Sequence, residues 1–301
     1  MSRSAPDSRL HTELSISRSR RFQGRSAPQV CLVKLQFGRS LPINLPLIIG
    51  HRGNSAEAPE NTIAAFARAL NDGADGIEFD VRLARDRTPV VIHDATLKRT
   101  GGLPAAVSAL SSAELTRLDV GSWFNRKFKS QARAEYALEA VPTLRRLLEF
   151  MAVNEASLYL EMKSDRSESE ELAVAVVMLV KEYALRDRVI VESFTLSAIE
   201  SVKRLDRDIK TAALFEPKRR PISLLHRLKL IELARCARAD EIALHHSLIS
   251  PRVVERATES QLPVVAWTVD RPAWVRRARI LGIKALITND PGRLICARQA
   301  G

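Results

Sequence analysis

Three carboxylates and two histidines stand within or directly after short apolar segments of the chain. They are Glu78, Asp80, Glu161, His51 and His93. Glu78 and Asp80 are two positions apart, so on a strand both side chains point to the same face and their charges repel. A hard divalent cation relieves this repulsion, and Glu161 from another strand supplies a third oxygen ligand. The sequence therefore predicts a metal site formed by these three carboxylates.

The two histidines add the possibility of proton transfer beside this site. His51 follows the apolar residues 47–50, and His93 follows the apolar residues 89–92. A lone histidine most often has a structural role. Two histidines at strand ends beside a carboxylate cluster indicate general acid–base catalysis, because imidazole takes up and releases protons near neutral pH.

The elements that must position these residues are short strands that alternate with helices. From residue 47 onward, β-branched segments alternate with helical patterns, which is typical of βα units and a largely parallel sheet. The expected strands are residues 47–51, 76–81, 89–93, 158–162, 189–193, 211–215, 241–245, 263–269 and 285–288. The expected helices include residues 61–71, 143–153, 170–184, 197–205, 253–260 and 273–281.

This alternation predicts an α/β fold, a (β/α)8 TIM barrel, over residues 47–301. Nine expected strands are one more than the barrel needs. Only eight residues separate Val81 from Val90, too few for a helical crossover, so the segments around Asp80 and His93 are expected to form a hairpin. The carboxyl ends of barrel strands meet at one rim, where barrel enzymes keep their active sites. The predicted catalytic residues are therefore expected to converge there.

Residues 94–142 break the alternation and are predicted to be a small insertion after an early strand. They contain Gly101-Gly102, a short helical segment near 112–118 and a polar stretch over 123–136. Because the insertion follows His93, we expect it over the active-site face as a lid or substrate-selecting flap. The alternative is an inert surface elaboration.

The charge balance is strongly basic, with a net charge of +12 and a pI near 10.1. Residues 1–46 hold eight basic and two acidic residues, a net +6 that is half of the excess. The other half is spread among helix-like stretches, and aromatic residues make up only 5% of the chain. A dedicated nucleic-acid site would need clustered charge with aromatic residues. Solvated helix faces explain the charge better, and no nucleic-acid partner is expected.

Residues 1–46 are predicted to be a basic, disordered N-terminal extension. They are rich in serine and arginine and contain no apolar core of the kind that a secretory signal requires. The composition resembles an organellar presequence and also upstream sequence translated from a start codon placed too early, and both interpretations stay open. Three widely spaced cysteines without a CxxC pair indicate a reducing compartment, and we predict a cytoplasmic location. No apolar run is long enough to span a membrane.

Linked motifs in one order resemble the glycerophosphodiester phosphodiesterase family. They are His51-Arg52-Gly53, residues 58–62 (Ala-Pro-Glu-Asn-Thr), residues 73–81 (Gly-Ala-Asp-Gly-Ile-Glu-Phe-Asp-Val), residues 89–94 (Pro-Val-Val-Ile-His-Asp), Glu161-Met162-Lys163, Ser193-Phe194, residues 267–270 (Trp-Thr-Val-Asp) and residues 287–291 (Ile-Thr-Asn-Asp-Pro). The resemblance covers about residues 47–295. Several motifs in the same order are far more specific than one motif.

The resemblance implies a phospholipase-C-like barrel that hydrolyses glycerophosphodiesters to glycerol 3-phosphate and an alcohol with a divalent metal, Mg²⁺, Ca²⁺ or Mn²⁺. The family's acid–base pair corresponds to His51 and His93, and its metal ligands correspond to Glu78, Asp80 and Glu161. Five further residues match supporting positions of the family. They are Arg52 beside the phosphate, Glu60 in the same cluster, Lys163 after the third carboxylate, and Phe194 and Trp267 in the pocket wall.

Several alternatives stay open at this point. Trp267 lies in an apolar segment and also suits an ordinary core position, and residues 60–62 also suit a helix cap. A lysophospholipase D activity would require an apolar rim, for which Trp123, Phe124 and Phe128 are candidates. A barrel that has lost catalysis would be a binding protein. The leaving alcohol, the native metal, the histidine that acts first as acid and the number of subunits are left undetermined.

Overall fold

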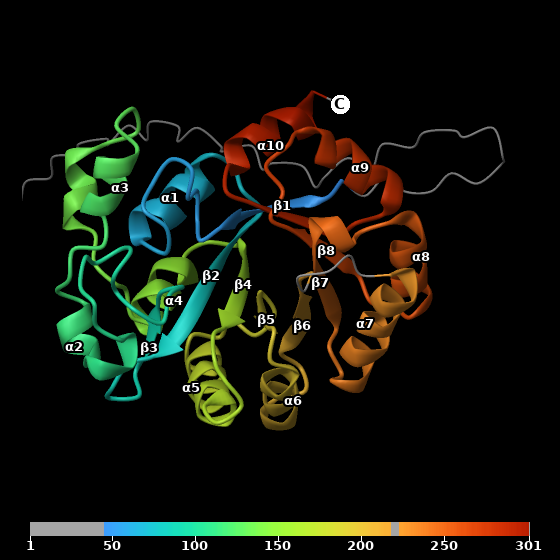
Figure 1. Ribbon diagram of the computed structural model, residues 1–301, viewed down its shortest axis with the longest axis horizontal. Coiled ribbons are helices and arrows are strands. Elements are labelled where there is room, and N and C mark those ends of the chain that lie inside the picture. Colours follow the sequence, from blue (N-terminus) through green and yellow to red (C-terminus); the bar gives the residue numbers. More distant parts are fainter. Residues whose placement is uncertain (1–44, 218–222, 301) are drawn as a thin grey trace, which may run out of the picture. The chain divides into compact units, whose positions relative to one another are not determined.

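The computed structural model describes residues 45–217 and 223–300 (Figure 1). The strands are β1 (Leu47–His51), β2 (Gly76–Leu83), β3 (Pro89–Val91), β4 (Ser157–Met162), β5 (Val189–Ser193), β6 (Lys210–Phe215), β7 (Glu241–His245), β8 (Val264–Trp267) and β9 (Ala285–Thr288). The helices are α1 (Ile63–Asn71), α2 (Ser112–Leu115), α3 (Ser122–Lys127), α4 (Leu144–Ala152), α5 (Ser169–Glu182), α6 (Leu196–Leu205), α7 (Leu224–Cys236), α8 (Pro251–Glu259), α9 (Ala273–Leu281) and α10 (Pro291–Gln299). Residues 1–44 of the predicted extension lie outside the described residues.

Eight parallel strands close into a barrel, which confirms the predicted (β/α)8 fold. They run in the order β1-β9-β8-β7-β6-β5-β4-β2, and β1 pairs with β2 to complete the ring. Side chains from β1 and from β4 to β9, among them Ile49, Tyr159 and Leu214, fill the barrel interior. The opposite strand faces pack against the surrounding helices in two larger clusters. Burial on both faces explains why these strands are apolar at almost every position.

The ninth strand forms the predicted hairpin. β2 is eight residues long, and β3 pairs with its last residues in antiparallel fashion, with Val81 opposite Val91 and Leu83 opposite Pro89. His93 therefore follows a strand that lies outside the ring of eight barrel strands, as the predicted hairpin requires. β2 continues beyond the rim, and β3 returns the chain, so that the backbone N–H of Ile92 donates to the carbonyl of Asp80 at 2.9 Å. The hairpin brings His93 back alongside β2, close to Asp80.

Residues 94–142 pack beside the barrel and form a small core of their own. Figure 1 shows α2 and α3 next to β3 and α1. Leu97, Val107 and Leu115 are buried with residues of the β2–β3 hairpin. None of these inserted residues lines the pocket described below. The insertion therefore packs beside the barrel, and its expected role as a lid or flap stays a prediction.

Within residues 45–217 and 223–300, no helix is long and apolar enough to cross a membrane. Most expected elements match the observed ones to within two residues at each end. The helices α7 and α10 were not among those that the sequence pattern named. Charged and apolar residues alternate around several faces of both helices, so neither shows one clear apolar stripe.

Candidate active site

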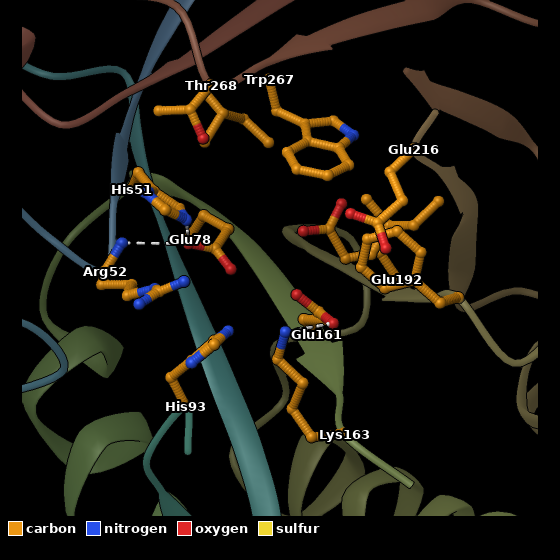
Figure 2. A pocket seen from close by; sticks show the side chains of 13 residues that line it. His51, Arg52, Glu78, His93, Glu161, Lys163, Glu192, Glu216, Trp267 and Thr268 are labelled. Carbon is orange, nitrogen blue, oxygen red and sulfur yellow. Dashed lines mark hydrogen bonds and ion pairs between the residues drawn. The ribbon is translucent and has the colours of Figure 1, made fainter. Parts of the chain in front are cut away.

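A cavity of about 380 Å³ opens at the carboxyl ends of the barrel strands (Figure 2). Its lining consists of His51, Arg52, Glu78, His93, Glu161, Lys163, Glu192, Phe194, Leu214, Glu216, Trp267, Thr268 and Ile287. Eight of the ten residues that the sequence singled out are in this lining. The other two, Asp80 and Glu60, lie directly behind it and contact Arg52. The chemistry-bearing residues therefore do converge at one rim of the barrel.

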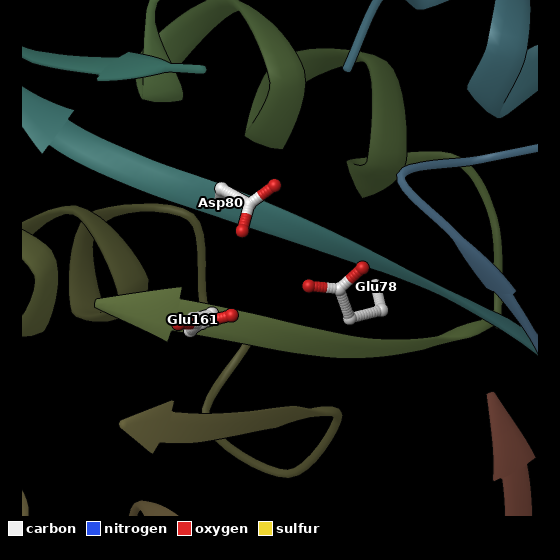
Figure 3. A group of neighbouring side chains, drawn as sticks. All are labelled: Glu78, Asp80 and Glu161. Carbon is white, nitrogen blue, oxygen red and sulfur yellow. The ribbon is translucent and has the colours of Figure 1, made fainter. Parts of the chain in front are cut away.

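Three carboxylates gather on two neighbouring strands (Figure 3). Glu78 and Asp80 lie on β2, and Glu161 lies on β4 in register with Asp80. The three side chains are almost fully buried, at 2%, 0% and 7% exposure. One oxygen of each lies within 4.8 Å of the others. This is the cluster that the two-residue spacing of Glu78 and Asp80 predicts.

Two protein cations partly neutralise this cluster. The Lys163 ammonium lies 2.6 Å from Glu161 Oε1 and 3.2 Å from Asp80 Oδ1. The Arg52 guanidinium lies 3.2 Å from Asp80 Oδ2, and the backbone N–H of Arg52 donates to Glu78 Oε2 at 2.9 Å. Three carboxylates thus face two cations, which leaves one negative charge in excess when all are ionised.

Burial and mutual repulsion shift the acidity of the cluster. Burial, followed by the charges of Asp80 and Glu161, raises the pKa of Glu78 well above its usual value. Burial and Asp80 raise the pKa of Glu161 to about 7. Burial opposes ionisation of Asp80, but Arg52 and Lys163 outweigh it and lower the pKa of that carboxyl. Repelling, converging oxygen donors fit a hard divalent cation, which would return Glu78 and Glu161 to their ionised forms.

His51, at the end of β1, presents Nε2 to the cavity. Its Nδ1 lies 2.7 Å from the amide oxygen of Asn289, so Nδ1 carries the proton and donates. The Asn289 amide nitrogen in turn donates to Asp270 at 2.9 Å, which fixes this orientation of the amide. Burial and the nearby Arg52 charge lower the pKa of His51 to about 4. His51 is therefore a neutral imidazole with an available basic nitrogen, 3.8 Å from Glu78.

His93 reaches the same cavity from a different side (Figure 2). Its Nδ1 lies 2.6 Å from Asp94 Oδ1, and Arg99 donates from Nε to the other oxygen of Asp94 at 2.7 Å. Burial lowers the pKa of His93, whereas Asp80 and the hydrogen bond to Asp94 act in the opposite direction. The two histidines thus differ in their partners, because an amide holds His51 and a carboxylate holds His93.

Glu60 lies behind Arg52 and links it to the insertion. Its carboxylate accepts from Arg52 Nη1 at 2.8 Å and from both Arg99 terminal nitrogens at 2.5 and 2.8 Å. The chain turns sharply before Glu60, and Gly53 has φ +82°, where a Cβ would lie 2.5 Å from the Ala65 backbone. Only glycine fits there, so the turn that aims Arg52 into the cavity depends on the residue that follows it.

Residues 61 and 62 combine the two roles proposed for this segment. Asn61 donates from Nδ2 to Asp80 Oδ2 at 2.8 Å, which orients a carboxylate of the cluster. Thr62 caps α1, because its hydroxyl accepts from the backbone N–H of Ala65. The segment therefore caps α1 and also holds a carboxylate of the cluster in place.

Phe194 and Trp267 form an aromatic wall of the cavity. Their rings are nearly perpendicular, with centroids 5.5 Å apart. Both line the cavity, so Trp267 is not an ordinary core residue. By contrast, Trp123, Phe124 and Phe128 pack with Ala58, Ala65 and Tyr136, away from the cavity lining. None of these three residues is in the lining of the cavity.

Two further carboxylates in the cavity, Glu192 and Glu216, were missed by the sequence analysis. Glu192 interrupts the apolar β5 just before Ser193, and Glu216 directly follows β6. The rule that found the other carboxylates, a polar residue at the end of an apolar strand, would have found both. Asn289, the partner of His51, likewise follows the last residue of β9.

The chain is similar to known proteins over most of its length. Residues 51–293 match the model of the glycerophosphoryl diester phosphodiesterase family. A glycerophosphodiester phosphodiesterase of Caldanaerobacter subterraneus subsp. tengcongensis is 35% identical over 252 residues, covering 83% of this chain and 96% of the relative. A glycerophosphodiester phosphodiesterase of Bacillus subtilis is 28% identical over 250 residues, covering 81% and 84%.

A solved structure with the same fold is that of an Oleispira antarctica phosphodiesterase in complex with its product sn-glycerol-3-phosphate. It has a TM-score of 0.75 and 28% identity, and the match covers 85% of this chain and 97% of that one. The family match spans most of the chain, and the similarity to the Caldanaerobacter enzyme extends over nearly the whole of that relative. The chain therefore belongs to the glycerophosphoryl diester phosphodiesterase family and is a phosphoric diester hydrolase.

Proposed function

We propose that the protein hydrolyses glycerophosphodiesters to glycerol 3-phosphate and an alcohol, with a divalent metal held by Glu78, Asp80 and Glu161. The observation that carries the proposal is that two histidines with different partners share one cavity with a carboxylate cluster of excess negative charge. The product named for the Oleispira structure supports the same substrate class.

The cluster and its cations suit an anionic phosphodiester. A bound divalent cation supplies charge neutralisation at the non-bridging phosphate oxygens. Arg52 and Lys163, both in the cavity lining, place two further positive charges beside the phosphate position. Preorganised cations of this kind stabilise the charge that develops in the transition state.

The partners of the two histidines support a different role for each in the first step. His51 is held by a neutral amide and keeps Nε2 unprotonated, so it removes the proton of the nucleophile. His93 is held by the Asp94 carboxylate, which stabilises the imidazolium, so it protonates the departing alkoxide. The assignment is the same whether the nucleophile is water or the neighbouring glycerol hydroxyl. Each such proton transfer contributes about 10²–10⁴-fold to the rate.

The other candidate functions receive less support. Lysophospholipids would need an apolar rim, and the aromatic residues considered for it are not in the cavity lining. A catalytically silent barrel would not need a complete set of acid–base and charged groups in one cavity. We therefore propose deacylated, small glycerophosphodiesters as substrates. The native metal, Mg²⁺, Ca²⁺ or Mn²⁺, and the cytoplasmic location stay predictions from the sequence.

The test is release of glycerol 3-phosphate from glycerophosphocholine and glycerophosphoethanolamine by the full chain, with each of the three metals and with chelator. The histidine variants are His51→Ala and, as a matched control, His226→Ala on the exposed surface of α7. We expect release that chelator abolishes, that His51→Ala loses and that His226→Ala retains. No release by folded protein with any metal would refute the function, and release insensitive to chelator would refute the metal site alone.

A further inference from the structure

One side of the cavity contains groups that the proposed hydrolysis does not use. Glu192 and Glu216 point toward the same space beneath the Trp267 indole (Figure 2). Phe194 lines the same region. We call these four residues the acidic–aromatic subsite. Neither of its carboxylates belongs to the cluster of Glu78, Asp80 and Glu161.

The Glu192 carboxyl is buried and incompletely paired. The residue is 1% exposed, and its Oε2 has no hydrogen-bond partner among the residues that the structure describes. A buried polar atom without a partner is costly, so an atom that faces a cavity in this state indicates a ligand with a hydrogen-bond donor. Glu192 therefore marks the subsite as a place for a bound group.

In the part of the chain that the structure describes, the second carboxylate, Glu216, is not neutralised by an ion pair, which suits a positively charged ligand. Glu216 is exposed at the cavity wall and forms no ion pair within residues 45–217 and 223–300. Lys163 is already engaged by Asp80 and Glu161, and it stands 5.7 Å from the Phe194 ring. Glu192 and Glu216 thus face the same space (Figure 2), and within the described residues neither of them forms an ion pair.

The aromatic rings distinguish an organic cation from a metal ion. Aromatic faces attract ammonium groups through the negative potential of the ring. They offer no oxygen ligand, which a hard metal ion requires. A primary ammonium group also donates hydrogen bonds, which the free oxygen of Glu192 needs, whereas a quaternary ammonium group has no N–H to donate.

The spacing suits a short alcohol. Glu192 is in register with the metal-site residue Glu161 on the adjacent strand, and neighbouring strands lie about 5 Å apart. The nitrogen of an aminoethyl ester stands three bonds of about 1.5 Å beyond the ester oxygen. An ammonium group on a two-carbon alcohol therefore reaches the next strand when the phosphate is beside Glu161.

We propose, on the basis of the phosphodiesterase function above, that the acidic–aromatic subsite binds the primary ammonium group of an amino-alcohol leaving group. The preferred substrate is then a glycerophosphodiester of a two-carbon amino alcohol, with Glu192 and Glu216 accepting from the ammonium and Phe194 and Trp267 packing around it.

The test compares kcat/KM of the full chain, with saturating metal, for glycerophosphoethanolamine, glycerophosphocholine and the uncharged-alcohol analogue glycerophosphoglycerol. The selectivity ratio of glycerophosphoethanolamine to glycerophosphoglycerol is measured in wild type, Glu192→Gln, Glu216→Gln and Glu200→Gln. Glu200 is an exposed glutamate on α6 and serves as the matched control. We expect the ratio to exceed one and to fall about threefold to tenfold in Glu216→Gln, and to stay unchanged in Glu200→Gln.

Several results would overturn the inference. One is an unchanged ratio in Glu216→Gln, and another is a preference for glycerophosphocholine over glycerophosphoethanolamine. A third is a raised metal requirement of Glu216→Gln with glycerophosphoglycerol, which would assign the carboxylates to a second metal ion. Cleavage of all three diesters without preference refutes this inference and leaves the proposed function intact, whereas cleavage of none refutes both. Because Glu216 is exposed, its variant keeps the test valid even if Glu192→Gln does not fold.

Discussion

The pair formed by His93 and Asp94 should set the pH above which the enzyme loses activity. In Asp94→Asn an amide of the same shape replaces the carboxylate 2.6 Å from His93 Nδ1. The hydrogen bond to Asp94 raises the pKa of His93, in opposition to burial and to the charges of Arg52 and Lys163. The substitution therefore lowers the pKa of His93. Since a general acid works only while it is protonated, the alkaline limb of kcat/KM should move to lower pH.

The size of this shift follows from the exposure of the pair. The side chains of His93 and Asp94 are 33% and 26% exposed, so water screens their interaction in part. A hydrogen bond to a charged group contributes about 1.5–3 kcal/mol when well shielded, and an exposed ion pair contributes less than about 1 kcal/mol. A value between them, about 1.4 kcal/mol, corresponds to one pKa unit. We expect the alkaline limb to move down by about one pH unit.

The assay is glycerol 3-phosphate release at several substrate concentrations, from about pH 5 to about pH 9, the range in which imidazole titrates. Asp187→Asn is the matched control, because Asp187 is exposed and lies outside the cavity lining. Its profile should coincide with that of wild type. The informative quantity is the pH at which kcat/KM falls on the alkaline side. The maximum value of kcat/KM is less informative, because Asp94→Asn also weakens the contact with Arg99 and so lowers that maximum.

An alkaline limb at the same pH in Asp94→Asn and wild type would refute the assignment of His93 as general acid. A shift to higher pH would show that the carboxylate does not stabilise the protonated form, which contradicts the geometry on which the assignment rests. A lower plateau with an unmoved limb would indicate that Asp94 only holds Arg99 and the insertion in place.

Three further outcomes are expected. Glu78→Gln removes one of the three converging charges, so Mg²⁺ affinity measured by calorimetry should fall more than about tenfold; unchanged affinity would place the metal elsewhere. Lys163→Met removes a cation of the cavity and should lower kcat/KM by about 10²–10³-fold at saturating metal; activity near that of wild type would exclude Lys163 from the transition-state contacts. Leu147→Ala leaves a cavity under the buried face of α4. The free energy of unfolding, measured in urea, should fall by about 2–5 kcal/mol, and kcat should not change. An unfolding midpoint equal to that of wild type would contradict the burial of Leu147.

Much of the fold and most of the site were predictable from the sequence, because they depend on patterns within short segments of the chain. Each barrel strand is a short apolar segment, and the residue after it must lie at the common rim once the barrel closes. This rule places His51 and Glu161 in one cavity without knowledge of their contacts, whereas Glu78 lies near the start of the longer β2. The two-residue spacing of Glu78 and Asp80 then brings their side chains to one face. Alternation and spacing are short-range properties, so the sequence alone carries them.

The tertiary structure decided what depends on contacts between distant segments. The amide partner of His51 is 238 positions away and reaches it only because β9 closes the barrel against β1. His93 enters the site through an antiparallel return of the chain, whose direction the apolar pattern of residues 89–92 does not encode. The insertion packs beside the mouth because its aromatic residues find partners on and before α1.

The same distinction separates the two groups of carboxylates. Glu78 and Asp80 are recognisable as a pair because they share one strand. Glu192 lies on β5 and Glu216 directly follows β6. Only the closed barrel turns both toward Trp267 and leaves Oε2 of Glu192 without a hydrogen-bond partner within the described residues. The sequence by itself determined which residue types stand at the strand ends. The tertiary structure decided which of them meet, because burial, pairing and charge balance arise only when the barrel brings distant segments together.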